Sequence, residues 1–138
     1  MVVAKTLAIS TQGNTDIVDI TPQVKREVAG CGVTSGAVTV FVVGSTAGVT
    51  TIECEPGLLA DFREFWERVA PRNIPYQHDR AWGDGNGFSH VRASLLGPSL
   101  AVPLVRGELV LGTWQQIVLV DFDNRPRQRE VIVQVVGE

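Results

Sequence analysis

The sequence contains few cysteines and no long apolar run. Its only two cysteines, Cys31 and Cys54, match no zinc-site or CxxC spacing, so the chain is not a disulfide-rich scaffold and both thiols are expected to be reduced. The longest apolar run covers only residues 37–43, whereas a membrane-spanning helix needs about 20 apolar residues. We therefore expect no membrane-spanning segment and no membrane partner.

Basic residues are also scarce, and they form no stripe. The chain has 12 Lys and Arg against 15 Asp and Glu, which gives a formal net charge of −3. Binding to a nucleic-acid backbone requires clustered Lys and Arg, so we expect no nucleic-acid partner. The N-terminal residues lack the charged start, the apolar stretch and the small-residue cleavage site of a secretory signal, which indicates a cytoplasmic protein.

The signatures of several common enzyme classes are absent. No GxGxxG, GxxxxGK(S/T), HExxH or GxSxG motif occurs, which argues against dinucleotide binding, P-loop chemistry, zincin proteolysis and serine hydrolysis. Hydrophobic residues make up 44% of the chain and charged residues 20%, as in a packed globular protein. No repeat or linker interrupts the sequence, so residues 1–138 are predicted to form a single domain.

Turn residues and apolar periodicity divide the chain into strand-rich ends and a helical middle. Residues 73–87 are predicted to form an irregular, functional loop, and the pattern as a whole indicates an antiparallel sheet or sandwich with helices on its faces. Helices are predicted over residues 22–29, from Pro56 to Pro71 and around residues 88–95, and strands over residues 2–10, 37–43, 48–52, 100–105, 109–122 and 127–136. The apolar stripe of the second helix is predicted to be core and consists of Leu58, Leu59, Phe62, Phe65, Trp66 and Val69.

The chain has only two histidines, and they flank a glycine-rich segment. His78 and His90 lie on either side of this segment, which includes Asp84. Two imidazoles and a carboxylate would suit a divalent metal. The spacing of the histidines is not diagnostic, however, because specific zinc motifs place paired ligands about two to five residues apart. The alternative is structural, with His78 bonded to a neighbouring backbone, His90 in a partly buried helix position and Asp84 in a turn.

Two further sets of charged residues alternate along predicted strands. Glu53 and Glu55 would share a face, where they would perform acid–base chemistry or form a solvated edge. Arg125, Arg127 and Arg129 would also share a face and would suit a phosphate or carboxylate ligand. The alternative is that the arginines pair with acidic neighbours on the surface, where such pairs contribute little stability.

An ordered series of short motifs extends through nearly the whole chain. The series consists of Ile20-Thr21, Thr46-Ala47-Gly48, Glu53, Tyr76-Gln77-His78, Asp84-Gly85-Asn86, His90, Leu96-Gly97-Pro98-Ser99, Pro103, Gly107, Leu111-Gly112-Thr113-Trp114-Gln115, Asp121-Phe122-Asp123 and Arg127-Gln128-Arg129. With this series the chain resembles the YjbQ-like family, whose members are linked to a secondary thiamine-phosphate synthase activity.

The resemblance implies a β-sandwich-like, mostly antiparallel α/β domain that assembles as a homotrimer and has a polar pocket, often with a divalent metal such as zinc or magnesium. It also implies a reaction that joins a pyrimidine diphosphate to a thiazole phosphate with loss of pyrophosphate. Carried over residue by residue, it implies catalytic roles for His78, Asp84, His90 and Glu53, with His78 and His90 as metal ligands. The implied ligand-binding residues are Asn86, Arg127, Arg129, Ser45 and Thr46.

One stretch departs from the family pattern. Family members usually read His-Thr-Thr-Ala where this chain reads Gly44-Ser45-Thr46-Ala47, so one of three expected histidines is absent. The metal site is therefore expected to be weakened and to depend on Asp84, Glu53 or water, and Gly44→His is expected to raise its affinity. Two hypotheses follow. One is an enzyme for a small phosphorylated or heterocyclic ligand, and the other is a non-catalytic relative that serves as a ligand-binding or oligomeric scaffold.

Overall fold

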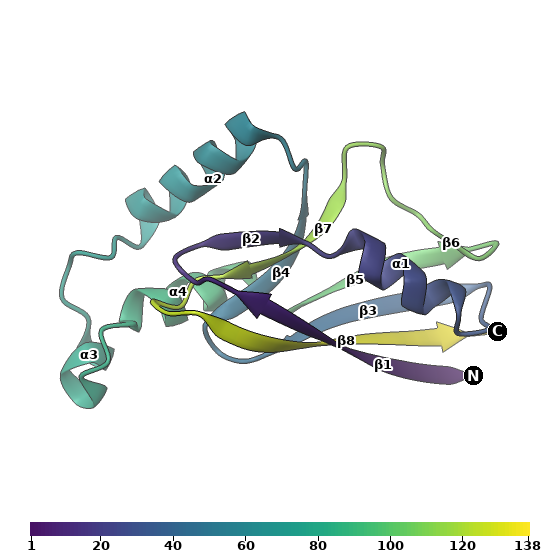
Figure 1. Cartoon of the computed structure of the whole chain (residues 1–138), viewed down its shortest axis with the longest axis horizontal. Helices are drawn as coiled ribbons and strands as arrows, with labels where there is room; N and C mark the ends of the chain where they lie inside the picture. Colours follow the sequence, from purple (N-terminus) through teal and green to yellow (C-terminus); the bar gives the residue numbers. More distant parts are fainter.

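Two antiparallel sheets form the body of the molecule in the computed structural model, which describes residues 1–138 (Figure 1). In spatial order, the larger sheet contains β1 (Val2–Thr11), β8 (Arg127–Gly137), β3 (Gly36–Val43), β5 (Ser99–Val105) and β6 (Glu108–Leu109). The smaller sheet contains β2 (Asp16–Asp19), β7 (Gln116–Asp121) and β4 (Ala47–Ile52). The helices are α1 (Thr21–Ala29), α2 (Pro56–Val69), α3 (Gln77–Trp82) and α4 (Gly87–Leu96). The predicted β-sandwich-like α/β fold is confirmed.

The smaller sheet lies between the larger sheet and two helices. Its central strand β7 is buried on both faces. Ile117 and Leu119 belong to the main core, which the two sheets share with α1, whereas Val118 and Val120 belong to a second core with α4 and with Trp66 of α2. A strand that is buried on both faces has an uninterrupted apolar run rather than an alternating one, which explains the composition of residues 117–120.

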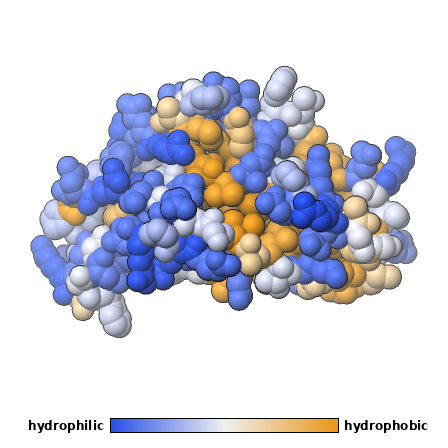
Figure 2. Space-filling view, viewed as in Figure 1, coloured by the Kyte–Doolittle hydropathy of each residue, from blue (hydrophilic) through white to orange (hydrophobic).

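The opposite face of the larger sheet is uncovered. Along β3, Val38, Val40 and Val42 are buried, whereas Phe41 and Val43 are exposed by 40% and 48%. Because successive side chains of a strand point to opposite faces, the exposed residues lie together on the outer face. Apolar residues also form a band across the middle of the face shown in Figure 2. The molecule therefore leaves a considerable apolar surface open.

Helix α2 projects away from the sheets and contacts them through one side only (Figure 1). Trp66 packs edge-on against Phe122, with ring centroids 4.9 Å apart. The prediction that the whole apolar stripe of this helix is core is wrong, because Phe65 and Val69 are exposed by 44% and 48%. The apolar stripe therefore covers more of the surface of α2 than the side that packs against the sheets. No helix of the chain has the length and apolarity needed to cross a membrane.

Three elements differ from the sequence-based expectations. The predicted strand over residues 109–122 is wrong, because β6 ends at Leu109 and residues 110–115 form a loop before β7. The side chain of Gln115 accepts a hydrogen bond from the Gly112 amide and closes a turn within this loop. The segment predicted to be irregular contains α3, and the short strand β2 was not predicted.

Candidate functional site

The two histidines lie side by side where α3 and α4 meet. His78 belongs to α3 and His90 to α4, and only residues 83–86 join the two helices. The ring centroids are 4.3 Å apart, and the ring planes are tilted by 37°. The two imidazoles that flank the glycine-rich segment in the sequence are therefore neighbours in the fold.

Glycines between the two helices make this proximity sterically possible. Gly83 and Gly85 have φ angles of +73° and +68°, which glycine adopts without strain. A Cβ atom on Gly87 would lie 2.7 Å from the Cβ of Tyr76, so only glycine fits at the start of α4. The Gly87 amide donates a hydrogen bond of 2.8 Å to Oδ1 of Asp79, which fixes α4 against α3.

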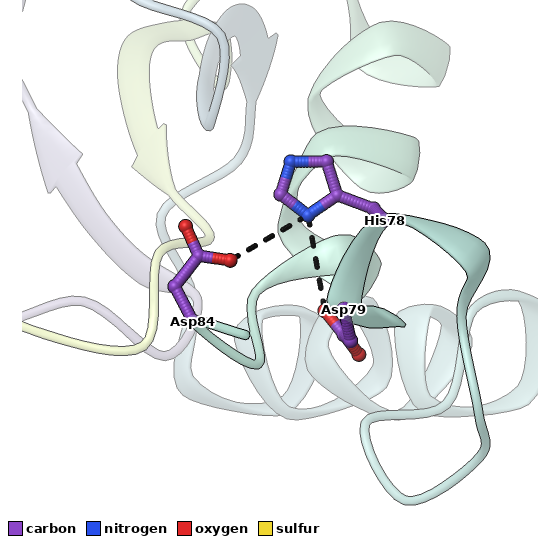
Figure 3. Close-up of side chains that lie close together, drawn as sticks. All are labelled: His78, Asp79 and Asp84. Atoms are coloured by element: carbon purple, nitrogen blue, oxygen red, sulfur yellow. Dashed lines mark ion pairs between the residues drawn. The ribbon is translucent and has the colours of Figure 1, made fainter. Parts of the chain in front are cut away.

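The Nδ1 atom of His78 points between two carboxylates (Figure 3). It lies 3.7 Å from Oδ1 of Asp84 and 3.8 Å from Oδ1 of Asp79. Both distances are too long for hydrogen bonds, and this buried nitrogen has no hydrogen-bond partner in the chain. Ligand atoms of the three residues all lie within 4.8 Å of one another, and His90 does not belong to this donor cluster. The arrangement suits a cation better than it suits a hydrogen-bonded histidine.

The pKa of the second imidazole, His90, is lowered from its ordinary value. Burial is the main cause that lowers the pKa of His90, and the adjacent charge of His78 lowers it further. The carboxylates of Asp123, Asp84 and Asp79 act in the opposite direction without reversing the shift. A neutral imidazole offers one N–H donor and one nitrogen acceptor to a ligand.

A buried polar network lies behind the histidines and includes Asn86 and Asp123. Oδ2 of Asp123 accepts hydrogen bonds of 3.0 Å from Thr46 and 2.9 Å from Arg127, and Oδ1 accepts a longer bond of 3.4 Å from Asn86. Burial alone would raise the pKa of Asp123, but hydrogen bonds, first of all from the Asn124 amide, lower it. Oδ1 of Asn86 is buried and accepts no hydrogen bond, so the site contains a second buried polar atom without a partner.

The two expected ligand-binding arginines are both engaged by carboxylates. Arg127 pairs with Asp123 over 2.8 Å, and Arg129 pairs with Asp121 over 2.7 Å. Thr11 also donates a hydrogen bond to Asp121. The hypothesis that the arginines form surface pairs with acidic neighbours is wrong for Arg129, because that residue is 7% exposed and both aspartates are fully buried. These two ion pairs hold β8 against the C-terminal end of β7.

Gly44 lies beside the histidine site, in the cavity where a third histidine was expected. This cavity has a volume of about 200 Å³, and its lining includes Gly44, Ser45, His90 and Ser94. Gly44 has a φ angle of +142°, and a Cβ atom on it would lie 2.7 Å from Nη1 of Arg129. Of the two residues that follow, Ser45 is exposed and Thr46 is buried in the Asp123 network.

Glu53 does not lie with the other candidate residues. It is exposed and follows the far end of β4, and its neighbours around a surface pocket include Asp19 and Cys54. At about 3.3 Å per residue, the length of β4 separates it from Thr46 by roughly 20 Å. Glu55 instead caps α2, because its carboxylate accepts hydrogen bonds from two amides of the first turn, which lower its pKa.

Asp79 is the residue of the donor cluster that the sequence analysis missed. It directly follows His78 and lies in the first turn of α3. The only signal in the sequence was that an acidic residue directly follows a histidine. Because residues 73–87 were predicted to form an irregular loop, nothing indicated that the side chains of His78 and Asp79 point to the same side.

These observations define a class of small two-sheet α/β proteins with a histidine–carboxylate cluster beside a second, neutral histidine. The family model described as "UPF0047 protein YjbQ-like" matches residues 5–138, and the chain belongs to this family. The expected family resemblance is confirmed.

Relatives of known sequence and structure support this membership over nearly the full length. A UPF0047 protein of Archaeoglobus fulgidus is 42% identical, and the match covers 94% of this chain and 98% of the relative. The UPF0047 protein YugU of Bacillus subtilis is 35% identical, and the match covers 96% of this chain and 98% of the relative. The crystal structure of a YbjQ-like protein of unknown function from Sulfolobus solfataricus P2 matches with a TM-score of 0.95 and 33% identity over 100% of this chain and 99% of that chain. A family structure from Clostridium acetobutylicum matches with a TM-score of 0.87 and 33% identity over 96% and 99%.

Proposed function

We propose that the protein is a small-molecule enzyme whose site holds a divalent cation at His78, Asp79 and Asp84, beside the neutral imidazole of His90. The observation that carries this proposal is the buried Nδ1 atom of His78, which has no hydrogen-bond partner and lies between two carboxylates. A buried polar atom without a partner costs free energy, and a bound cation would remove that cost.

The spacing of the donor atoms supports a cation. Two ligand atoms on a tetrahedral ion with bonds of about 2.0 to 2.1 Å lie about 3.4 Å apart. The separations of 3.7 and 3.8 Å between Nδ1 of His78 and the two carboxylate oxygens are close to this value. A histidine with two carboxylates favours zinc, and magnesium is the second candidate because it prefers oxygen ligands. Bound there, a divalent cation would stabilise negative charge on a leaving group.

The reaction that we propose resembles thiamine-phosphate synthesis, in which a pyrimidine diphosphate is joined to a thiazole phosphate and pyrophosphate leaves. The cation cluster and His90 lie together where α3 and α4 meet, and their partial exposure would give a small phosphorylated ligand access. His90 would donate one hydrogen bond to such a ligand. Asn86, which belongs to the buried polar network next to the histidines, would stabilise the site. We also propose that the protein is located in the cytoplasm.

The proposed assembly is a homotrimer. The outer face of the five-stranded sheet supports association, because it exposes a row of large apolar residues and no helix covers it. The exposed residues on this face include Val2, Phe41, Val43, Val105 and Val136. Phe41 lies opposite Ile132, and Val136 lies opposite Val2, so the outer face carries apolar residues on three neighbouring strands.

The proposed activity is tested by an assay for thiamine phosphate with both phosphorylated substrates and added Zn²⁺ or Mg²⁺. We expect product formation by the wild-type protein and at least a tenfold loss in His78→Ala and in Asp84→Asn. Asp61→Asn on the exposed side of α2 is the matched control, and its activity should equal that of the wild type. No product with either cation, or full activity in His78→Ala, would contradict the proposal.

A ligand-binding or oligomeric scaffold without catalysis is the second candidate function. Gly44 favours it, because the expected third imidazole is missing next to His90. The same assay separates the two functions. A trimer that binds the phosphorylated substrates but forms no product would support the scaffold.

A further inference from the structure

The two sheets separate along a groove between β4 and β5, which is called the β4–β5 groove below (Figure 1). The groove has a volume of about 280 Å³, and most of its lining residues are hydrophobic. No charged residue lines it, which favours an uncharged ligand. Two of the short motifs, Leu96–Ser99 and Leu111–Gln115, contribute to this lining, although the proposed function gives neither of them a role.

On one side of the groove, β5 has backbone groups without partners. In an antiparallel pair, the N–H and C=O groups of successive residues point alternately toward the partner strand and away from it. The Val42 amide donates to the Pro98 carbonyl, so the N–H and C=O groups of Ser99 and Ala101 point away from β3. Strand β6 pairs with β5 only beyond this stretch, and no other residue bonds to these groups. Two residues of β5 therefore offer free donors and acceptors to the groove.

The free stretch of β5 is short and is closed at both ends. At one end the Val49 amide donates to the Gly97 carbonyl over 3.1 Å, which ties β4 to the segment that leads into β5. At the other end the Val110 amide donates to the Pro103 carbonyl over 3.0 Å. A bound peptide strand would be unable to continue past either bond. The free groups are therefore better matched by a compact ligand than by a strand.

Ala101 offers a donor and an acceptor side by side. Its side chain is a single methyl group and the residue is exposed, so its backbone groups are accessible from the groove. Pro103 has the same orientation along β5 but carries no N–H. A planar ring with a nitrogen next to an amino group presents an acceptor and a donor in the complementary order, and its apolar faces suit the hydrophobic lining. Ligand pockets commonly combine an apolar lining with a few such polar groups.

We infer that the β4–β5 groove binds an uncharged amino-heterocycle, such as an aminopyrimidine, through the backbone N–H and C=O of Ala101. The volume of about 280 Å³ is near the lower limit of about 300 Å³ for ligand pockets, so the ligand is small. The lining includes none of His78, Asp79 and Asp84, and the inference does not depend on the proposed cation site.

The probe for the test is 4-aminopyrimidine, which is titrated into metal-free protein near neutral pH while the backbone amide signals are followed by NMR. We expect a saturable shift of the Ala101 amide with a Kd of about 1 mM or below. Ala101→Pro removes the free N–H and keeps every hydrogen bond to β3, and proline is tolerated at such an edge position. This variant should lose about tenfold in affinity. Ala101→Val keeps the N–H and is the matched control, which should bind like the wild type.

Two further comparisons keep the test decisive if Ala101→Pro does not fold. Pyrimidine without the amino group lacks the donor and should bind the wild-type protein about tenfold more weakly than 4-aminopyrimidine. Val110→Trp fills the groove from a side chain that is 54% exposed, so it should fold and should lose binding. Equal affinity for the two probes, or wild-type affinity in Val110→Trp, would overturn the inference.

Other results would also overturn it. These are the absence of a saturable shift up to about 10 mM probe, wild-type affinity in folded Ala101→Pro, or the largest shifts at His90 instead of Ala101. Light scattering should give the same mass for folded Ala101→Pro and the wild type, because a changed mass would mean that another copy of the chain pairs with this edge.

The test is separate from the test of the proposed function. His78→Ala should bind 4-aminopyrimidine like the wild type, and loss of binding in that variant would assign the probe to the histidine site and refute the groove. Probe binding at Ala101 without Zn²⁺ binding would refute the cation site alone, whereas Zn²⁺ binding without probe binding would refute the groove alone.

Discussion

Among single residues, His90 reports most directly on the histidine pair, through its pKa. Burial and the adjacent charge of His78 lower the pKa of His90, so we expect it to titrate below the ordinary value of about 6.5. The variant His78→Ala removes that charge and should raise the pKa of His90. NMR titration of the His90 ring protons in both proteins measures the difference. A His90 that titrates at or above about 6.5 in the wild type would contradict the geometry described here.

The sign of this shift fixes how the folding stability changes with pH. Because the folded-state pKa of His90 is lowered, the unfolded chain binds more protons between the folded and the unfolded values. The folded protein should therefore lose stability as the pH falls from about 6.5 through the folded-state pKa. His90→Gln should show less of this loss in thermal melts over the same range.

The variant Gly44→His introduces the histidine that the family pattern predicts at this position. The sequence alone predicts stronger metal binding for this variant, but the structure adds a cost. The φ angle of +142° is unfavourable for a side chain, and the guanidinium of Arg129, which Asp121 holds in place, would have to move. We expect a loss of stability of about 1 to 3 kcal/mol, as for other strained backbone positions. Denaturant unfolding measures it, with Gly107→His as the control for backbone strain alone.

The sequence predicted some residues of the site and not others. His78 and His90 stood out because the chain has no other histidines and a glycine-rich segment separates them. The burial of the arginine pairs could not be predicted, because alternation along a strand places Arg127 and Arg129 on one face without saying which face is covered.

At the scale of elements, α2 depends on a single buried side chain for its attachment. Trp66 is 4% exposed and packs against Phe62, Phe65 and Phe122. Trp66→Ala should cost about 3 to 5 kcal/mol, as for other large-to-small core substitutions. Trp66→Phe should cost less than half as much, because it keeps an aromatic contact and removes a buried N–H that has no partner. Urea unfolding of both variants measures the two costs, and equal costs would show that the contact with Phe122 does not attach the helix.

Elements with strong local signals were predicted correctly, and those that depend on tertiary contacts were not. Thr21 and Pro22 marked the start of α1, and β8 was predicted to within one residue of its end. The division between β6 and β7 was missed, because residues 109–122 are apolar enough to resemble one long strand. The turn between them is closed by the side chain of Gln115, which carries no general turn signal.

At the scale of the whole molecule, the uncovered sheet face predicts association. Phe41→Lys places a charge in the middle of the apolar outer face and should dissociate the proposed homotrimer, because a buried unpaired charge is costly. Light scattering should give about three times the chain mass of 14.9 kDa for the wild type and one chain mass for the variant. Val69→Lys, on the exposed side of α2, has similar exposure and should stay trimeric. A monomeric wild type would contradict the assembly.

The measurement that tests the central claim most directly is a calorimetric titration of Zn²⁺ into metal-free protein. The account predicts one ion per chain, at least a tenfold lower affinity in His78→Ala, and unchanged affinity in Asp61→Asn. The reason is that Nδ1 of His78 is the one nitrogen in the donor cluster, and its two carboxylate neighbours alone form a weaker site for zinc. Absence of binding in the wild type, or equal affinity in His78→Ala, would contradict the claim that His78, Asp79 and Asp84 hold a cation.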